Sequence, residues 1–173
     1  MAKVVEELNQ VRPIREDGSE EPMSNELVAK MTYTKQVVKE VLRYRPPATM
    51  VPHIAVNDAQ VGEYEIKKGT VILPSIWSAH LDDFPEPEKF DPERFNNERE
   101  KDPKTVKSFL AFGYGPHRCI GMQYALNHLI CFASELARSY DWKRKETPNG
   151  DDIVFLPTIF PKDGVLISMR KKD

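Results

Sequence analysis

The sequence predicts a mainly helical fold with small β-sheets, an α+β class. Residues 25–44 and 119–140 place apolar side chains at three- and four-residue steps, which is typical of helices. Residues 51–74 contain short β-branched runs broken by Asn-Asp, Val-Gly and Lys-Gly, which favour small antiparallel strands. Residues 82–95 are rich in proline, which excludes a regular helix or a central strand there.

Composition limits the class of protein. The 173 residues are 40% hydrophobic and carry a formal net charge of −2, which suits one modest core and gives no sign of a nucleic-acid partner. Cys119 and Cys131 lack Cys-x-x-Cys spacing, which argues against a disulfide framework or a cysteine zinc site and favours a reducing compartment. No run of about 18 apolar residues or signal-peptide core occurs, so we expect no anchor or export signal in this chain.

The first part of the chain is a helix and a connector. Residues 3–11 predict a short helix, and the charged stretch "PIREDGSEEPMS" after it has no apolar face to bury. We therefore treat residues 1–24 as an N-terminal helix with a charged connector, and residues 25–173 as the main part.

Residues 25–44 predict one helix or two short ones, ended by "RPP". Glu40 and Arg43 lie three residues apart on one face of this helix. Taken alone, such a pair is an ordinary exposed ion pair worth a few tenths of a kcal/mol.

The middle of the chain predicts little regular structure. After the strands of residues 51–74, residues 75–81 suit a helical turn, and residues 96–107 suit a solvated segment. The coil of residues 82–95 is expected to be ordered, because its aromatic side chains can bury apolar area: Phe84, Phe90 and Phe95.

The C-terminal part predicts a helix and a hairpin. Apolar residues cover most of the circumference of the helix 119–140, which indicates deep burial. The runs "DIVFLP" and "GVLISM" flank "TIFPKD", so we expect the two runs to pair as a hairpin with a broad tip.

Cys119 stands in "FGYGPHRCIG", between a glycine-rich loop and the start of a helix. Unpaired backbone N–H groups and the helix dipole favour a thiolate there, whereas Cys131, among apolar neighbours, suits a small buried hydrophobe. A thiolate is either a nucleophile or a metal ligand. His117 is the one nearby base and no orienting third group is recognisable, which argues against a cysteine hydrolase.

The surroundings of Cys119 favour a large flat cofactor. Gly113, Gly115 and Gly121 would keep side chains clear where such a group meets the backbone, and Phe112 could pack against it. Each glycine alone is explained equally well as a turn residue. Their joint spacing about one cysteine favours the cofactor.

The loop "FGYGPHRCIG" resembles the haem-binding loop of the cytochromes P450. The resemblance implies the C-terminal portion of the cytochrome P450 fold, a haem b cofactor, and Cys119 as its axial ligand and the catalytic residue. It further implies that the residues bordering the cofactor are Phe112, Gly113, Gly115, His117, Gly121, Ala125 and His53. His53 and His117 stand where the wider family places cationic side chains beside the haem propionates, although His53 also suits a half-exposed strand residue.

Two further motifs follow the family's order. "EVLR" supplies Glu40 and Arg43, and "PERF" supplies Arg94. In the family these side chains form an ion-pair network that ties the helix to the meandering coil.

Within the family, "MTYTKQVVKEVLRYRPPATMVPH", "FLAFGYGPHRCIGMQYALNHL" and "LPTIFPKDG" are similar to the sterol C-22 desaturases. The resemblance implies that a sterol, O2 and an NADPH-dependent reductase are the partners, and that the full-length enzyme lies on the cytoplasmic face of the endoplasmic reticulum membrane. Another sterol-oxidising cytochrome P450 is the alternative. The expected substrate contacts, which ordinary apolar packing would also explain, are Ala48, Thr49, Met50, Val51, Thr158, Ile159 and Phe160.

The chain is short for this family, whose members have several hundred residues, a membrane anchor and a central helix that delivers protons to oxygen. We find no segment that resembles that helix. The resemblance therefore implies a C-terminal fragment that is inactive at this length. A non-catalytic truncated remnant is the other interpretation, and the DNA upstream of Met1 would distinguish them.

Overall fold

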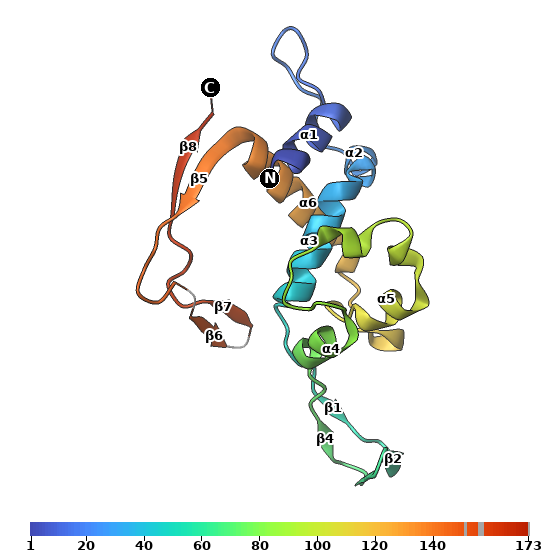
Figure 1. The fold of residues 1–173 in the computed structure, drawn as a ribbon. Coiled ribbons are helices and arrows are strands. Elements are labelled where there is room, and N and C mark those ends of the chain that lie inside the picture. Colours follow the sequence, from blue (N-terminus) through green and yellow to red (C-terminus); the bar gives the residue numbers. More distant parts are fainter. Residues whose placement is uncertain (151, 156–157, 173) are drawn as a thin grey trace.

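A computed structural model describes residues 1–150, 152–155 and 158–172 (Figure 1). The α-helices are α1 (Ala2–Val11), α2 (Asn25–Lys30), α3 (Thr32–Tyr44), α4 (Ile76–Asp83), α5 (Pro103–Ser108) and α6 (Met122–Ser139). Three short 3-10 helices are Pro92–Phe95, Arg99–Lys101 and Gly115–His117. The strands are β1 (His53–Ile54), β2 (Ala59–Val61), β3 (Tyr64–Ile66), β4 (Val71–Ile72), β5 (Tyr140–Arg144), β6 (Ile153–Phe155), β7 (Ile159–Pro161) and β8 (Ile167–Lys171). The predicted class, helices with small antiparallel sheets, is confirmed.

The core lies where α1, α2 and α3 meet α6 (Figure 1). Its buried side chains come from all four helices: Leu8, Val28, Met31, Val38, Leu42, Leu126 and Ile130. The N-terminal helix is therefore part of the same core as the rest of the chain. Among the described residues, none of the helices has both the length and the apolar character needed to span a membrane.

Helix α3 begins at a contact with α1. The Glu7 carboxylate accepts hydrogen bonds from the backbone N–H groups of Tyr33 at 2.6 Å and Thr34 at 2.8 Å. The first N–H groups of a helix have no partner within it. Met31, the residue before α3, makes no side-chain capping bond, so Glu7 of α1 caps the helix instead. This contact fixes the start of the helix that carries Glu40 and Arg43.

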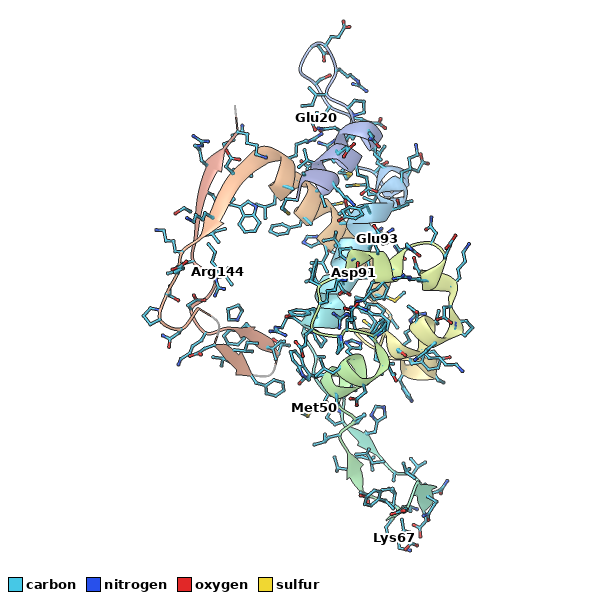
Figure 2. All side chains as sticks on the ribbon, viewed as in Figure 1. Glu20, Met50, Lys67, Asp91, Glu93 and Arg144 are labelled. Carbon is cyan, nitrogen blue, oxygen red and sulfur yellow. The ribbon has the colours of Figure 1, made fainter. Side chains whose placement is uncertain are left out.

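The strands form four separate antiparallel pairs: β1–β4, β2–β3, β5–β8 and β6–β7. The first two pairs make a thin arm, with Lys67 near its far end (Figure 2). Their side chains are mostly exposed, which leaves the arm with little core of its own.

The expected C-terminal hairpin is wrong in its pairing. Strand β6 pairs with β7, which lies in the expected tip, and β8 pairs instead with β5, a strand that periodicity did not predict. The chain turns after β7 at Gly164, which has a φ of 69°, and this turn separates β7 from β8. Leu156 and Pro157, the end of the expected first run, lie outside the described residues.

The prediction that the helix of residues 119–140 is deeply buried is also wrong. Leu126, Ile130 and Ala137 of α6 are buried, but Tyr124 is 78% exposed and Phe132 is 60% exposed. Periodicity shows which positions are apolar and does not show which neighbour covers them.

Two details of the middle segment differ from expectation. Phe84 and Phe95 are buried, whereas Phe90 is 47% exposed and packs edge-on against Tyr44. Residues 96–107, predicted as a solvated segment, are mostly exposed as expected, but they also contain a 3-10 turn and most of α5, whose first turn is capped by Asp102. Proline at the first position of α5 suits a helix start, which explains why it did not break the helix.

Candidate functional site

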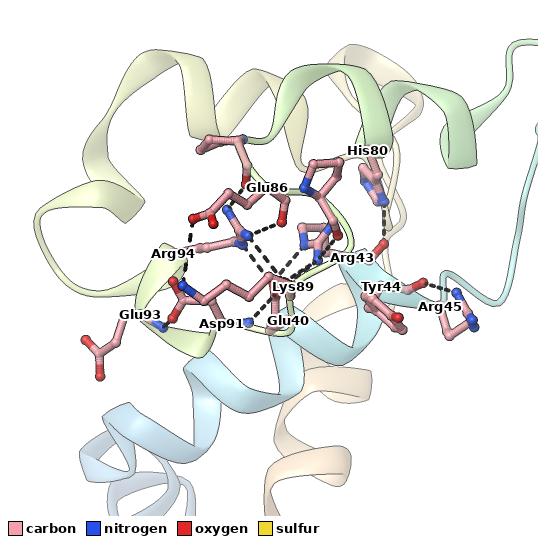
Figure 3. Close-up of polar contacts among 12 residues, drawn as sticks. Glu40, Arg43, Tyr44, Arg45, His80, Glu86, Lys89, Asp91, Glu93 and Arg94 are labelled. Atoms are coloured by element: carbon pink, nitrogen blue, oxygen red, sulfur yellow. Dashed lines mark hydrogen bonds and ion pairs between the residues drawn. The ribbon is translucent and has the colours of Figure 1, made fainter.

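Glu40 is the centre of a buried polar network (Figure 3). Its side chain is fully buried, and its two carboxylate oxygens accept hydrogen bonds from Arg43 Nε at 2.7 Å and Arg43 Nη2 at 2.9 Å. The Asp91 N–H donates to the same carboxylate at 2.9 Å, and Arg94 Nε lies 3.3 Å from it. The structure thus brings Glu40, Arg43 and Arg94 into direct contact.

The two arginines hold the irregular coil of residues 84–91 through its carbonyl groups. Arg43 Nη2 donates to the Pro87 carbonyl at 2.9 Å, and Arg94 donates to the carbonyls of Pro85 and Glu86. Glu86 has a φ of 45°, which non-glycine residues rarely adopt. A proline-rich coil that cannot form a ladder therefore becomes ordered by side-chain donors (Figure 3).

His80 connects this network to the segment that leads into the cysteine loop. Its ring, only 1% exposed, has Nδ1 3.0 Å from the Arg43 carbonyl, and its Nε2 accepts the Leu110 N–H at 2.9 Å. The ring also stacks on Phe109, with centroids 6.0 Å apart. Burial lowers the pKa of His80 from its ordinary value, partly opposed by its hydrogen bond to the Arg43 carbonyl.

The lowered pKa of His80 predicts a loss of stability in acid. The unfolded chain binds the proton first, so the contribution of this histidine is complete above about pH 6.5 and decreases as the pH falls below that value. We expect the urea-unfolding free energy to drop between about pH 7.5 and about pH 5.5. His80→Gln should reduce this loss of unfolding free energy, whereas His128→Gln, at an exposed histidine, should leave it unchanged. An equal loss in the parent and both variants would show that His80 does not cause it.

The cysteine loop is closed by its own backbone. The Cys119 N–H donates to the Phe112 carbonyl at 2.8 Å, and the Gly113 N–H donates to the Leu110 carbonyl at 2.8 Å. Gly113 and Gly115 have φ values of 71° and 72°, a conformation that favours glycine. The conformation of the turn therefore favours glycine at both of these positions.

The two cysteines have different surroundings. Cys119 is exposed, three residues before the first residue of α6, and its sulfur lies 3.8 Å from where a Cβ on Gly121 would stand. Cys131 is half-buried within α6, where burial and then the neighbouring Glu135 raise the pKa of its thiol. Of the two, Cys119 is the accessible one, and Cys131 is held in the protonated form that binds metals poorly.

His53 and His117 lie beside one another although they are 64 positions apart in the sequence. Their ring centroids are 6.4 Å apart and the rings are nearly perpendicular. The Val51 carbonyl lies 2.7 Å from His53 Nδ1 and can only accept, so Nδ1 carries a proton. The arm of β1–β4 thus brings one histidine to the cysteine loop.

Of the two stretches expected to contact substrate, the second lies against Pro47, the residue just before the first stretch, and none of the described residues 48–51 lines the pocket found there. The Ile159 N–H donates to the Pro47 carbonyl at 3.2 Å, and a pocket of about 470 Å³ lies between β6–β7 and residues 45–47. Ile159 and Phe160 line this pocket. Ala48 and Thr49 are half-buried, whereas Met50, Val51 and Thr158 are exposed.

Sequence reasoning missed His80 and the backbone carbonyls of residues 85–89. A lone histidine in a short helix carries no pattern, and carbonyl acceptors carry no side-chain signal at all. The family resemblance placed Arg94 in a network with Glu40 and Arg43, but it did not predict that Arg94 donates to the carbonyls of Pro85 and Glu86.

The comparisons with known proteins agree on one family. The cytochrome P450 family model matches residues 1–162. Cytochrome P450 710A2 of Arabidopsis thaliana is 46% identical over 87% of this chain, and a probable cytochrome P450, 524A1, of Dictyostelium discoideum is 44% identical over the whole of it. A C-22 sterol desaturase of Aspergillus fumigatus is 39% identical over 86%. The chain spans 32%, 32% and 29% of these proteins, about a third of their length.

A solved structure matches the fold. The cyanobacterial cytochrome CYP120A1, solved with retinoic acid bound, superposes with a TM-score of 0.79 at 29% sequence identity. The match covers 99% of this chain and 39% of that protein.

Proposed function

Because the chain belongs to the cytochrome P450 family, we propose that it is the haem-binding part of a sterol C-22 desaturase with Cys119 as the axial ligand of haem b. The observation that carries the proposal is the exposed Cys119 thiol at the end of a closed glycine loop. The relatives that bear the name C-22 sterol desaturase, at 33% to 39% identity, support the reaction.

The residues around Cys119 fit a haem. Free cysteines are usually buried, so an exposed thiol on an ordered loop suits a ligand. A Cβ on Gly121 would stand beside the sulfur, and Ile120 exposes its whole apolar side chain. Ala125 adds only a methyl group in the first turn of α6, and Phe112 packs against the core from the loop. A flat apolar group held through the thiol would cover this surface.

The haem, when bound, supplies oxygen activation, because a thiolate ligand donates electron density that favours O–O cleavage. The chain's own residues supply position. The Phe112 carbonyl fixes the backbone of Cys119, and the Glu40 network fixes the coil of residues 84–91. The pocket at Ile159 and Phe160, which Arg45, Arg144 and Asp152 also line, would contact the sterol.

His53 and His117 bind the haem propionates in this proposal. Their adjacent rings form a pair of nitrogen donors next to the cysteine loop, where a dianionic edge requires donors. Because the Nδ1–H of His53 is engaged by the Val51 carbonyl, its Nε2 could donate to a propionate only when it carries a second proton, so this contact requires the cationic ring.

We expect haem to be lost faster when either histidine is removed. In a complete enzyme carrying this segment, His53→Ala and His117→Ala should each speed transfer of haem to an acceptor protein by roughly tenfold, the loss of about one charge-assisted hydrogen bond. His128→Ala, at an exposed histidine on α6, is the matched control. Unchanged transfer in both variants would contradict the propionate assignment.

The proposed partners are a sterol, O2 and an NADPH-dependent reductase. The proposed location of the full-length enzyme is the cytoplasmic face of the endoplasmic reticulum membrane.

The proposed reaction is tested by expressing a complete enzyme carrying this segment in cells that lack C-22 desaturase activity. Gas chromatography should reveal a sterol with a new side-chain double bond. Accumulation of a hydroxylated sterol instead would favour another sterol-oxidising cytochrome P450.

The 173-residue chain alone should show no desaturation, even with haem and reductase supplied. The reason is that no segment in it resembles the helix that delivers protons to oxygen in the family. The measurement is sterol product after incubation with the purified chain. Turnover above that of a heated sample would contradict this expectation.

A further inference from the structure

His80 lies between helix α3 and the segment that leads into the cysteine loop. On one side lies the last turn of α3, which carries Arg43 and the Glu40 network. On the other side lies Leu110, two residues before the start of the cysteine loop at Phe112. The ring of His80 contacts both, through Nδ1 at 3.0 Å and Nε2 at 2.9 Å.

The two partners fix the protonation state of the ring. The Arg43 carbonyl can only accept, so Nδ1 carries the proton, and the Leu110 N–H can only donate, so Nε2 is bare. A doubly protonated ring would direct an N–H at the Leu110 N–H. Burial lowers the pKa of His80, and the charged groups that act on the ring, Arg43, Asp83 and Glu40, have opposing effects. The neutral Nδ1–H tautomer is the one that fits.

The connection continues from Leu110 to Cys119 through the loop. The Leu110 carbonyl accepts the Gly113 N–H at 2.8 Å, and the Phe112 carbonyl accepts the Cys119 N–H at 2.8 Å. Phe109 stacks on the His80 ring and meets Phe112 edge-on, with centroids 6.5 Å apart. The imidazole therefore anchors the segment whose carbonyl groups close the cysteine loop.

The geometry points to His80 as a positioning residue for the Cys119 loop: its neutral ring holds the entrance of the loop against α3 and so sets where the thiol is presented. The role of this thiol as a haem ligand rests on the proposed function. The restraint that His80 places on the loop is independent of the proposed function, because protein atoms alone make it.

Substitutions at His80 can separate the stacking of its ring from its two hydrogen bonds. His80→Phe keeps an aromatic ring to stack on Phe109 but removes both hydrogen bonds and leaves the Leu110 N–H unpaired. His80→Gln places a carbonyl oxygen that can accept from Leu110, so it should restore part of the constraint. His128→Phe makes the same chemical change at an exposed position on α6 and is the matched control.

The first test is hydrogen exchange, followed by mass spectrometry, on the 173-residue chain without haem. In His80→Phe we expect peptides covering residues 109–121 to exchange roughly tenfold faster, with an intermediate rate in His80→Gln and the parent rate in His128→Phe. Unchanged exchange in residues 109–121 of His80→Phe would overturn the proposal. An equal acceleration in α1 and α3 would also overturn it, because it would show general destabilisation.

The second test uses a complete haem-loaded enzyme carrying this segment. The reduced carbon monoxide complex of His80→Phe should lose its thiolate-type spectrum roughly tenfold faster than the parent, with His80→Gln between them, at equal haem content. A rate equal to the parent would overturn the role of His80. If no variant or parent shows a thiolate-type spectrum, the proposed function fails, and the exchange experiment still decides whether His80 holds the loop.

Discussion

Replacing Glu40 by glutamine destabilises the chain by about 3–5 kcal/mol, the usual cost of removing one partner from a buried ion pair. Glu40 is fully buried and its carboxylate is the shared acceptor of Arg43, Arg94 and the Asp91 N–H. Without that charge, two guanidinium groups stay buried beside carbonyl groups alone. The measurement is the urea-unfolding free energy of the purified variant and parent.

An exposed ion pair provides the control for Glu40. Arg170 and Asp141 form a 2.9 Å contact between β8 and β5, with the Arg170 side chain 84% exposed. Arg170→Met should therefore change the unfolding free energy by about 0–1 kcal/mol. If Glu40→Gln costs no more than Arg170→Met, the buried network does not order the coil of residues 84–91.

Replacing Cys119 by alanine abolishes the thiolate-type spectrum of the reduced carbon monoxide complex in a complete enzyme carrying this segment. Cys119 is the exposed thiol on the closed loop, and no other side chain of that loop offers sulfur. Cys131→Ala should keep the spectrum, because that thiol is half-buried in α6 with its pKa raised by burial and Glu135. The reverse result would contradict the assignment of the ligand.

Local pattern predicted the helices well. Apolar steps of three and four residues marked α2 with α3, and α6, to within a few residues, and the spacing of Glu40 and Arg43 placed them on one face of α3. The same spacing could not predict that the pair is buried, because most such pairs are exposed. Burial depends on the coil of residues 84–95, which is distant in sequence.

Non-local contacts explain what the sequence did not predict. The pairing of β5 with β8 joins residues 23 to 31 positions apart in the sequence, and a closer and equally β-prone run was the obvious alternative. His80 acts through two backbone groups from different elements, so its position in the sequence carries no signal. For the candidate site, the spacing of glycines about Cys119 was readable, whereas the approach of His53 to His117 needed the fold of the β1–β4 arm.

In the proposed enzyme, Cys119 supplies the sulfur that binds haem iron. Iron-edge X-ray absorption of a complete haem-loaded enzyme carrying this segment can test this assignment, because the method counts the atoms bound to the metal. We expect one sulfur neighbour of the iron in the parent and in Cys131→Ala, and none in Cys119→Ala. A sulfur neighbour that persists in Cys119→Ala would contradict it.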